Sequence, residues 1–179
     1  QDSFHQDLYI CLFEPPFFQD QLSYLLNQED LLIHVFLHYK WKYTFQKNRI
    51  PIFQKYKLVR PEVTIRNHRF DFLLNNKSGK NFFLEVKSVT FVEDGIAKFP
   101  DAVTTRGMNH AKTLTDLVKE GEFAGILFVC QRPDATLFEP MWDRDPMFSN
   151  ALFNAYKMGV KVWCITLNVS QTEISFNKE

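Results

Sequence analysis

The amino-acid sequence predicts a single α/β domain in which helices cover a mixed sheet. The chain has 179 residues, the length of one compact domain. Its residues are 45% hydrophobic and include 19 phenylalanines, enough to fill a packed core. The spacing of apolar residues alternates between helical and strand periods, giving a helix, three strands, a helix, a strand, a helix and a strand. This order is typical of helices packed on a sheet.

Each expected element follows from apolar spacing and from the residues at its ends. Gly79 lies in a turn, Gly121 follows a helical run, and Pro146 suits a helix start. The order predicts an N-terminal helical segment over residues 1–47, packed on a main domain over residues 48–179. The expected elements are helices near 17–26 and 29–46, strands at 58–65, 69–75 and 81–91, a helix at 103–119, a strand at 124–130, a helix from Asp145-Pro146 to Gly159, and a strand at 160–169.

Composition favours a soluble, cytoplasmic protein. No apolar run approaches the roughly 20 residues that cross a bilayer, and no charged-then-apolar leader opens the chain. Cys11, Cys130 and Cys164 lack the spacing of a zinc site, and an odd number of cysteines does not indicate a disulfide framework. Cys130 and Cys164 lie within apolar runs that are expected to be buried strands.

Charge is segregated along the chain although the formal net charge is zero. Residues 1–39 contain six acids and no lysine or arginine, whereas residues 40–69 contain nine basic residues against Glu62 alone. This basic zone includes several aromatic residues and could bind a polyanion through phosphate contacts and stacking. The alternative is a solvated face or an intramolecular partner for the acidic segment.

Three charged residues lie in two neighbouring expected strands. Strand periodicity places Glu85 and Lys87 on one face of residues 81–91. If residues 69–91 form a simple hairpin centred on Ser78, Asp71 lies opposite Glu85 with its side chain on the same face. The sequence therefore predicts that two carboxylates and one ammonium group converge.

These three residues suit metal-dependent phosphodiester chemistry. Carboxylates among apolar residues are costly to bury unless a cation compensates them, and Mg²⁺ takes one or two carboxylates together with waters and phosphate oxygens. Asp71 and Glu85 would hold Mg²⁺ or Mn²⁺, and Lys87 would orient a water or stabilise charge on the phosphate. The alternative for Glu85 and Lys87 alone is a surface ion pair. The apolar neighbours of each charge favour a catalytic centre.

Several segments resemble the sugar fermentation stimulation protein A (SfsA) family. The strongest are RFDFLL at 69–74, FLEVKSVT at 83–90, and FPDAVTTRG at 99–107 followed by His110, with weaker matches at 50–63, 145–152 and 159–163. The resemblance implies a restriction-endonuclease-like, PD-(D/E)xK nuclease domain over 48–179. Asp71 would be its first acid, and Glu85 and Lys87 would form its E-x-K motif. It also implies DNA binding, nuclease activity and a regulatory role in sugar metabolism.

The resemblance implies roles for five further residues. Arg69, Asp101, Thr104, Arg106 and His110 match the family pattern and would line or support the cleft. Arg106 and His110, four residues apart at a helix start, could meet a phosphate. Asp101 is either a second metal ligand or the cap of the 103–119 helix, and the cap is favoured.

Departures from the family pattern leave two functions open. Residues 1–47 do not match the N-terminal OB-like domain that members usually carry, and a family acidic pair aligns near Lys42 and Tyr43. Glu62 could serve as a supporting acid or pair with a basic neighbour. One function is a Mg²⁺- or Mn²⁺-dependent nuclease on DNA or RNA, with a homodimer as an open expectation. The alternative is a catalytically inactive, SfsA-like nucleic-acid-binding transcriptional regulator.

Overall fold

The computed structural model describes residues 51–169 and 174–176, so the helices expected near 17–26 and 29–46 lie outside the described residues. The described part confirms a mixed α/β architecture. In chain order the elements are η2 (Pro51–Phe53), β1 (Tyr56–Ile65), β2 (His68–Asn76), β3 (Asn81–Val89), β4 (Val92–Glu93), β5 (Ile96–Phe99), α2 (Thr105–Lys119), β6 (Phe123–Cys130), β7 (Leu137–Pro140), α3 (Pro146–Lys157), β8 (Lys161–Val169) and β9 (Ile174–Phe176).

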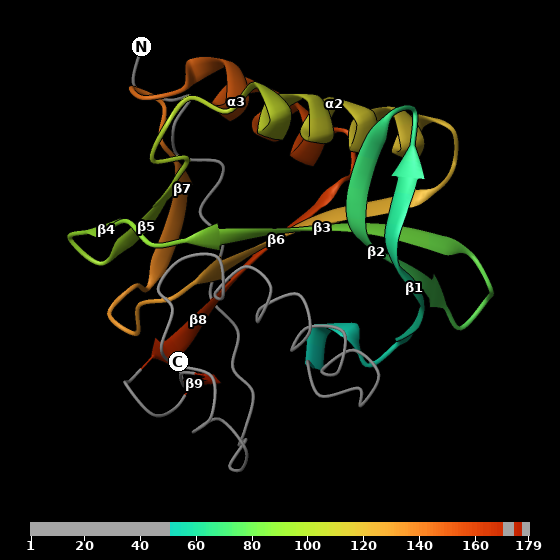
Figure 1. Cartoon of the computed structure of the whole chain (residues 1–179), viewed down its shortest axis with the longest axis horizontal. Coiled ribbons are helices and arrows are strands. Elements are labelled where there is room, and N and C mark those ends of the chain that lie inside the picture. Colours follow the sequence, from blue (N-terminus) through green and yellow to red (C-terminus); the bar gives the residue numbers. More distant parts are fainter. Residues whose placement is uncertain (1–50, 170–173, 177–179) are drawn as a thin grey trace.

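The main sheet has six strands in the order β1-β2-β3-β6-β8-β9. The pairs β1–β2, β2–β3 and β8–β9 are antiparallel, and the pairs β3–β6 and β6–β8 are parallel. Parallel neighbours need long crossover connections, and these contain α2 and α3, which lie together on one face of the sheet (Figure 1). Neither helix in the described ranges is long and apolar enough to cross a membrane.

Both faces of the central strands are buried, which explains the unbroken apolar run in β6. Ile126 and Phe128 belong to a core cluster shared with Leu114 of α2 and Leu152 of α3. Leu127 and Val129 face the opposite side, in a second cluster that includes Phe53, Phe72 and Ile165. A strand buried on both faces carries apolar residues at successive positions instead of alternating with polar ones.

The starts of α2 and α3 are capped and joined by one aspartate. Asp145 Oδ1 accepts a hydrogen bond from Phe148 N at 2.9 Å, as expected from the Asp145-Pro146 pair, and its Oδ2 accepts from Thr104 N at 2.7 Å. Thr104 Oγ1 in turn accepts from Gly107 N at 3.0 Å. The prediction that Asp101 caps this helix was wrong, because α2 begins at Thr105 and Thr104 occupies the cap position.

A second, three-stranded sheet of order β4-β5-β7 was not expected. Its strands have two to four residues, too few to show a period. One signal was present: Asp94 and Gly95 both have positive φ, 51° and 75°, between strands in which Glu93 pairs with Ile96. Asp-Gly is a favoured two-residue hairpin turn.

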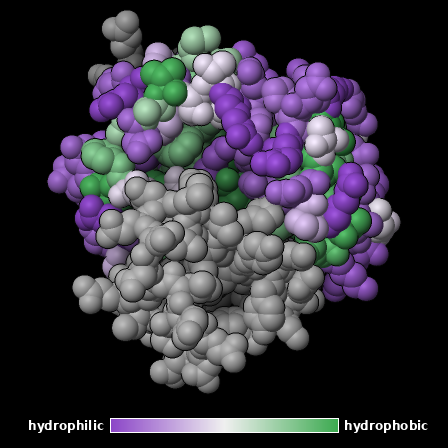
Figure 2. Space-filling model, viewed as in Figure 1, coloured by the Kyte–Doolittle hydropathy of each residue, from purple (hydrophilic) through white to green (hydrophobic). Residues whose placement is uncertain are grey.

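In the space-filling view, hydrophilic residues make up much of the described surface (Figure 2).

Candidate catalytic centre

The β2–β3 hairpin has the register expected from its sequence. Phe72 pairs with Leu84 and Leu73 with Phe83, so the next positions in the same register are Asp71 and Glu85. Leu73 and Phe83 both pack in the cluster on the helix side of the sheet. Because side chains alternate along a strand, Asp71 and Glu85 face the same side, toward α2.

The ladder between β2 and β3 ends at Phe72, and the Asp71 side chain continues the connection. Its Oδ2 accepts a hydrogen bond from the backbone N–H of Val86 at 2.7 Å. The carboxylate thus takes the place that a backbone carbonyl would have in a continued ladder. This contact holds Asp71 against the strand that carries Glu85 and Lys87.

Glu85 is 3% exposed and is bonded to two donors through one oxygen. Its Oε1 lies 2.6 Å from Lys87 Nζ and 2.6 Å from His110 Nδ1. Because an ionised carboxylate only accepts hydrogen bonds, the His110 ring donates through Nδ1. The other oxygen, Oε2, is buried and has no hydrogen-bond partner in the described part of the chain.

The two carboxyl groups have pKa values displaced in opposite directions. Burial, together with the charge of Glu85, raises the pKa of Asp71 to about 7, against the Val86 hydrogen bond and the charges of Lys87 and Arg106. Burial also acts to raise the pKa of Glu85, but the His110 hydrogen bond and the Lys87 charge outweigh it and hold that pKa below its usual value. At neutral pH Glu85 is ionised, whereas Asp71 is divided between its two forms.

His110 is placed differently from the expectation that it meets a phosphate. Its side chain is 2% exposed and packs against Phe70 and His68, with ring centroids 5.2 and 5.5 Å away. It lies one helical turn beyond Arg106 and packs against β2. Its ring therefore holds Glu85 by a hydrogen bond within the core and does not face a bound phosphate. This contact joins residues 25 positions apart, and sequence spacing offers no signal for it.

Arg106 and Thr104 lie at the start of α2. Arg106 is exposed in the first turn, and its charge acts on Asp71. The hydroxyl of Thr104 accepts the hydrogen bond that caps the helix, so this contact is structural. The structure therefore places the charge of Arg106 near Asp71, on the helix side of the sheet.

The expected supporting acids take other contacts. Glu62 has φ 50° and forms an exposed ion pair with Arg69, with Oε1 and Nη1 3.8 Å apart. This contact is the second of the two alternatives expected for Glu62, pairing with a basic neighbour. Asp101 is exposed, and its carbonyl oxygen accepts from Arg144 Nη1 at 3.1 Å. Among the described residues, no three His, Cys, Asp or Glu side chains gather to hold a metal ion. Lys42 and Tyr43, which align near the family acidic pair, lie outside the described residues.

Comparisons with known proteins agree on one family. The family model described as sugar fermentation stimulation protein RE domain matches residues 37–173. A sugar fermentation stimulation protein homolog from Clostridium tetani is 42% identical over 126 residues, which are 70% of this chain and 55% of that protein. A homolog from Methanosphaera stadtmanae is 39% identical over 124 residues, 69% of this chain and 50% of the relative. The chain thus spans about half the length of the curated relatives it matches.

A solved structure shares the fold. SfsA from Pyrococcus furiosus superposes with a TM-score of 0.73 and 24% sequence identity, covering 94% of this chain and 76% of that one. The family match extends over both strands of the candidate centre and over α2. The chain therefore belongs to the sugar fermentation stimulation protein (SfsA) family.

Proposed function

We propose that this chain is a metal-dependent phosphodiesterase with a restriction-endonuclease-like fold, hydrolysing DNA or RNA at Asp71, Glu85 and Lys87. The observation that carries the proposal is the buried, unpartnered Oε2 of Glu85, beside a second carboxyl group whose pKa is raised to about 7. Leaving a buried carboxylate oxygen without a partner is costly. A cation bound by both carboxylates would remove that cost and the repulsion between them.

The donor set fits a hard divalent cation. Mg²⁺ and Mn²⁺ favour oxygen ligands, and Mg²⁺ commonly takes one or two carboxylates while keeping waters and substrate phosphate oxygens. The related P. furiosus protein is described in complex with Ca²⁺, another oxygen-liganded ion. Asp71 and Glu85 would hold the ion. When bound, it would make a water nucleophilic and offset the charge that builds on the scissile phosphate.

Three side chains of this chain would assist. The His110 hydrogen bond fixes Oε1 of Glu85 and leaves Oε2 available as a ligand. Lys87 has 17% of its side chain exposed, and its ammonium group would stabilise charge on a phosphate. Arg106, in the exposed first turn of α2, would contact a neighbouring phosphate with help from the positive end of the helix dipole.

A cleavage assay tests the proposal. The full chain is incubated with labelled single- and double-stranded DNA and RNA, with Mg²⁺, Mn²⁺ or EDTA. Cleavage is expected with metal and absent in EDTA, and Lys87→Ala should reduce it by about 100-fold or more. Lys112→Ala, which removes an exposed lysine of α2, is the matched control and should cleave normally. Absence of cleavage on every substrate by a folded protein would overturn the proposal and favour the nucleic-acid-binding regulator.

A further inference from the structure

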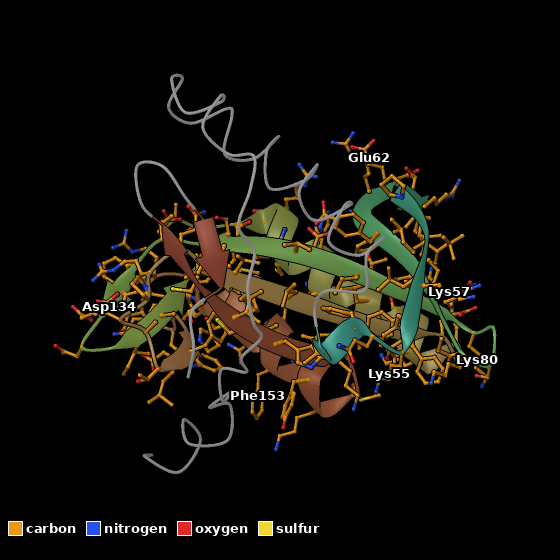
Figure 3. The ribbon with its side chains drawn as sticks, turned by 90° about the horizontal axis from the view of Figure 1, so that it is seen from below. Lys55, Lys57, Glu62, Lys80, Asp134 and Phe153 are labelled. Atoms are coloured by element: carbon orange, nitrogen blue, oxygen red, sulfur yellow. The ribbon has the colours of Figure 1, made fainter. Side chains whose placement is uncertain are left out.

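Four exposed lysines lie at one end of the main sheet, away from the candidate centre. Lys55 and Lys57 stand at the start of β1, and Lys57 pairs with Asn75 of β2. Lys77 and Lys80 stand in the turn that leads from β2 into β3. We call these four residues the lysine edge. Lys55, Lys57 and Lys80 are labelled at this end in Figure 3, and Asp134 at the opposite end.

The four lysines of the lysine edge form no ion pair with the described acids. Residues 51–61 and 72–84 contain no aspartate or glutamate. At the opposite end the cations are paired: Arg132 with Asp134, and Lys98 with Glu93 at 2.7 Å and Glu139 at 3.4 Å.

Aromatic rings and a tight turn position these lysines. Lys80 Nζ lies 5.5 Å from the ring centroid of Phe123, which is 40% exposed, and Lys55 Nζ lies 5.6 Å from that of Tyr56. Asn76 Oδ1 accepts hydrogen bonds from the backbone N–H groups of Ser78 at 3.0 Å and Lys80 at 2.9 Å. Cations interspersed with rings form the kind of surface that binds nucleic-acid strands.

The distance between this surface and the candidate centre suits one bound strand that passes around the end of the sheet. Lys80 contacts Phe123 on the face opposite α2, whereas Asp71 and Glu85 face α2. Asp71 and Asn76 lie five residues apart on β2, which at about 3.3 Å per residue is roughly 16 Å. Successive phosphates of one duplex strand advance about 3.4 Å along the helix axis, so the span corresponds to about five nucleotides. A ligand of one or two nucleotides would be too short to contact both places.

We propose that the lysine edge binds the phosphate backbone of the substrate about five nucleotides from the scissile phosphate. This inference rests on the proposed function and deepens it, because it names a second surface that would hold the polynucleotide at a distance from the scissile phosphate. The chemistry is general for phosphates and reads no base, so binding is independent of sequence and sensitive to salt.

Binding is measured by fluorescence anisotropy with a labelled DNA duplex in EDTA, over a series of NaCl concentrations. The variant Lys57→Glu with Lys80→Glu should raise Kd about tenfold and make the slope of log K against log salt less negative by about 2, the loss of two phosphate contacts. Arg132→Glu with Arg144→Glu makes the same change in net charge at the opposite end of the sheet and should leave Kd within about twofold. Circular dichroism melting checks that both variants fold.

The outcomes separate this inference from the proposed function. Unchanged binding by the lysine variant, or equal losses in both variants, would overturn the inference. Binding of anionic phospholipid vesicles through these lysines, with no duplex bound, would overturn it as well. Because binding in EDTA does not need hydrolysis, a protein that binds the duplex through these lysines but never cleaves it would contradict only the proposed function.

A substrate-size comparison gives the second readout. The lysine variant should have a raised KM on the duplex and an unchanged rate on bis(p-nitrophenyl) phosphate, which is too small to contact the lysine edge. An unchanged KM on the duplex would contradict the inference, whatever the rate on the small ester.

Discussion

The two halves of the candidate centre shift the pKa of their carboxyl groups in opposite directions. In the β2 half, Asp71 accepts a hydrogen bond from a backbone N–H group, and its pKa is raised to about 7. In the half formed by β3 and α2, Glu85 is bonded to Lys87 and His110, and its pKa is lowered. Burial acts to raise the pKa of both groups. The difference therefore comes from the neighbouring groups: two side-chain donors lower the pKa of Glu85, whereas the charge of Glu85 adds to burial in raising the pKa of Asp71.

The largest expected effect is the loss of unfolding free energy when Glu85 is replaced. Glu85→Gln removes the negative charge that compensates Lys87 and that accepts the hydrogen bond of the buried His110 ring, and removing one partner of a buried ion pair costs about 3 to 5 kcal/mol. Urea unfolding at neutral pH in EDTA measures this loss. Glu139→Gln, which removes a partly exposed acid 3.4 Å from Lys98, is the matched control and should cost under about 1 kcal/mol.

Equal losses from Glu85→Gln and Glu139→Gln would mean that the burial of Glu85 adds nothing to its ion pair. That result would contradict the contrast between the two halves.

Asp71→Asn is expected to act in the opposite direction and to depend on pH. Asp71 has an ordinary pKa of 3.8 and a folded pKa of about 7. Between these values the native state binds more protons than the unfolded state, so the wild type loses stability as pH rises through this window. Asparagine cannot ionise, and its oxygen can still accept from Val86. The variant should therefore match the wild type near pH 4 and exceed it by up to about 4 kcal/mol at pH 8.

Unfolding free energies of both proteins in EDTA, measured from pH 4 to pH 8, check this prediction. Parallel curves would show that the Asp71 proton is not linked to folding. A variant less stable than the wild type at pH 8 would show that the carboxylate stabilises the fold even without metal.

A divalent cation should reduce the contrast between the halves. Mg²⁺ added at ten times its Kd stabilises a protein that binds it only in the folded state by about 1.4 kcal/mol. This gain should be present in the wild type at pH 8, smaller at pH 5, where Asp71 is protonated, and absent in Asp71→Asn. Thermal melts with and without Mg²⁺ measure it. An equal gain in the wild type and the variant would place the ion elsewhere.

The contrast also separates what the sequence could predict from what it could not. The register between β2 and β3 followed from a turn centred on Ser78, because a hairpin fixes its pairs once its midpoint is known. The start of α3 followed from Asp145-Pro146 for an equally local reason. Local rules therefore predicted most of the strands and the facing of Asp71 and Glu85.

Contacts made across layers were not predictable in this way. The bond between His110 and Glu85 depends on how α2 lies over β3, and the cap of α2 depends on Asp145, which is 41 residues away from Thr104. Asp101 suited a helix cap by residue type, but the cap position is set by where packing starts the helix. The lowered pKa of Glu85 depends on the first of these contacts, the hydrogen bond from His110.

The smallest expected effect distinguishes two arginines near Asp71. The charge of Arg106 acts on Asp71, whereas Arg69 pairs with Glu62 at the surface. Arg106→Ala should therefore raise the pKa of Asp71 further, by a few tenths of a unit because this side chain is exposed and solvent screens it. Arg69→Ala should leave that pKa unchanged and cost under about 0.5 kcal/mol of stability. Carboxyl ¹³C NMR titration in EDTA, at low and high salt, reports both values. Equal shifts from the two variants would mean that the field at Asp71 is set by net charge and not by the position of α2.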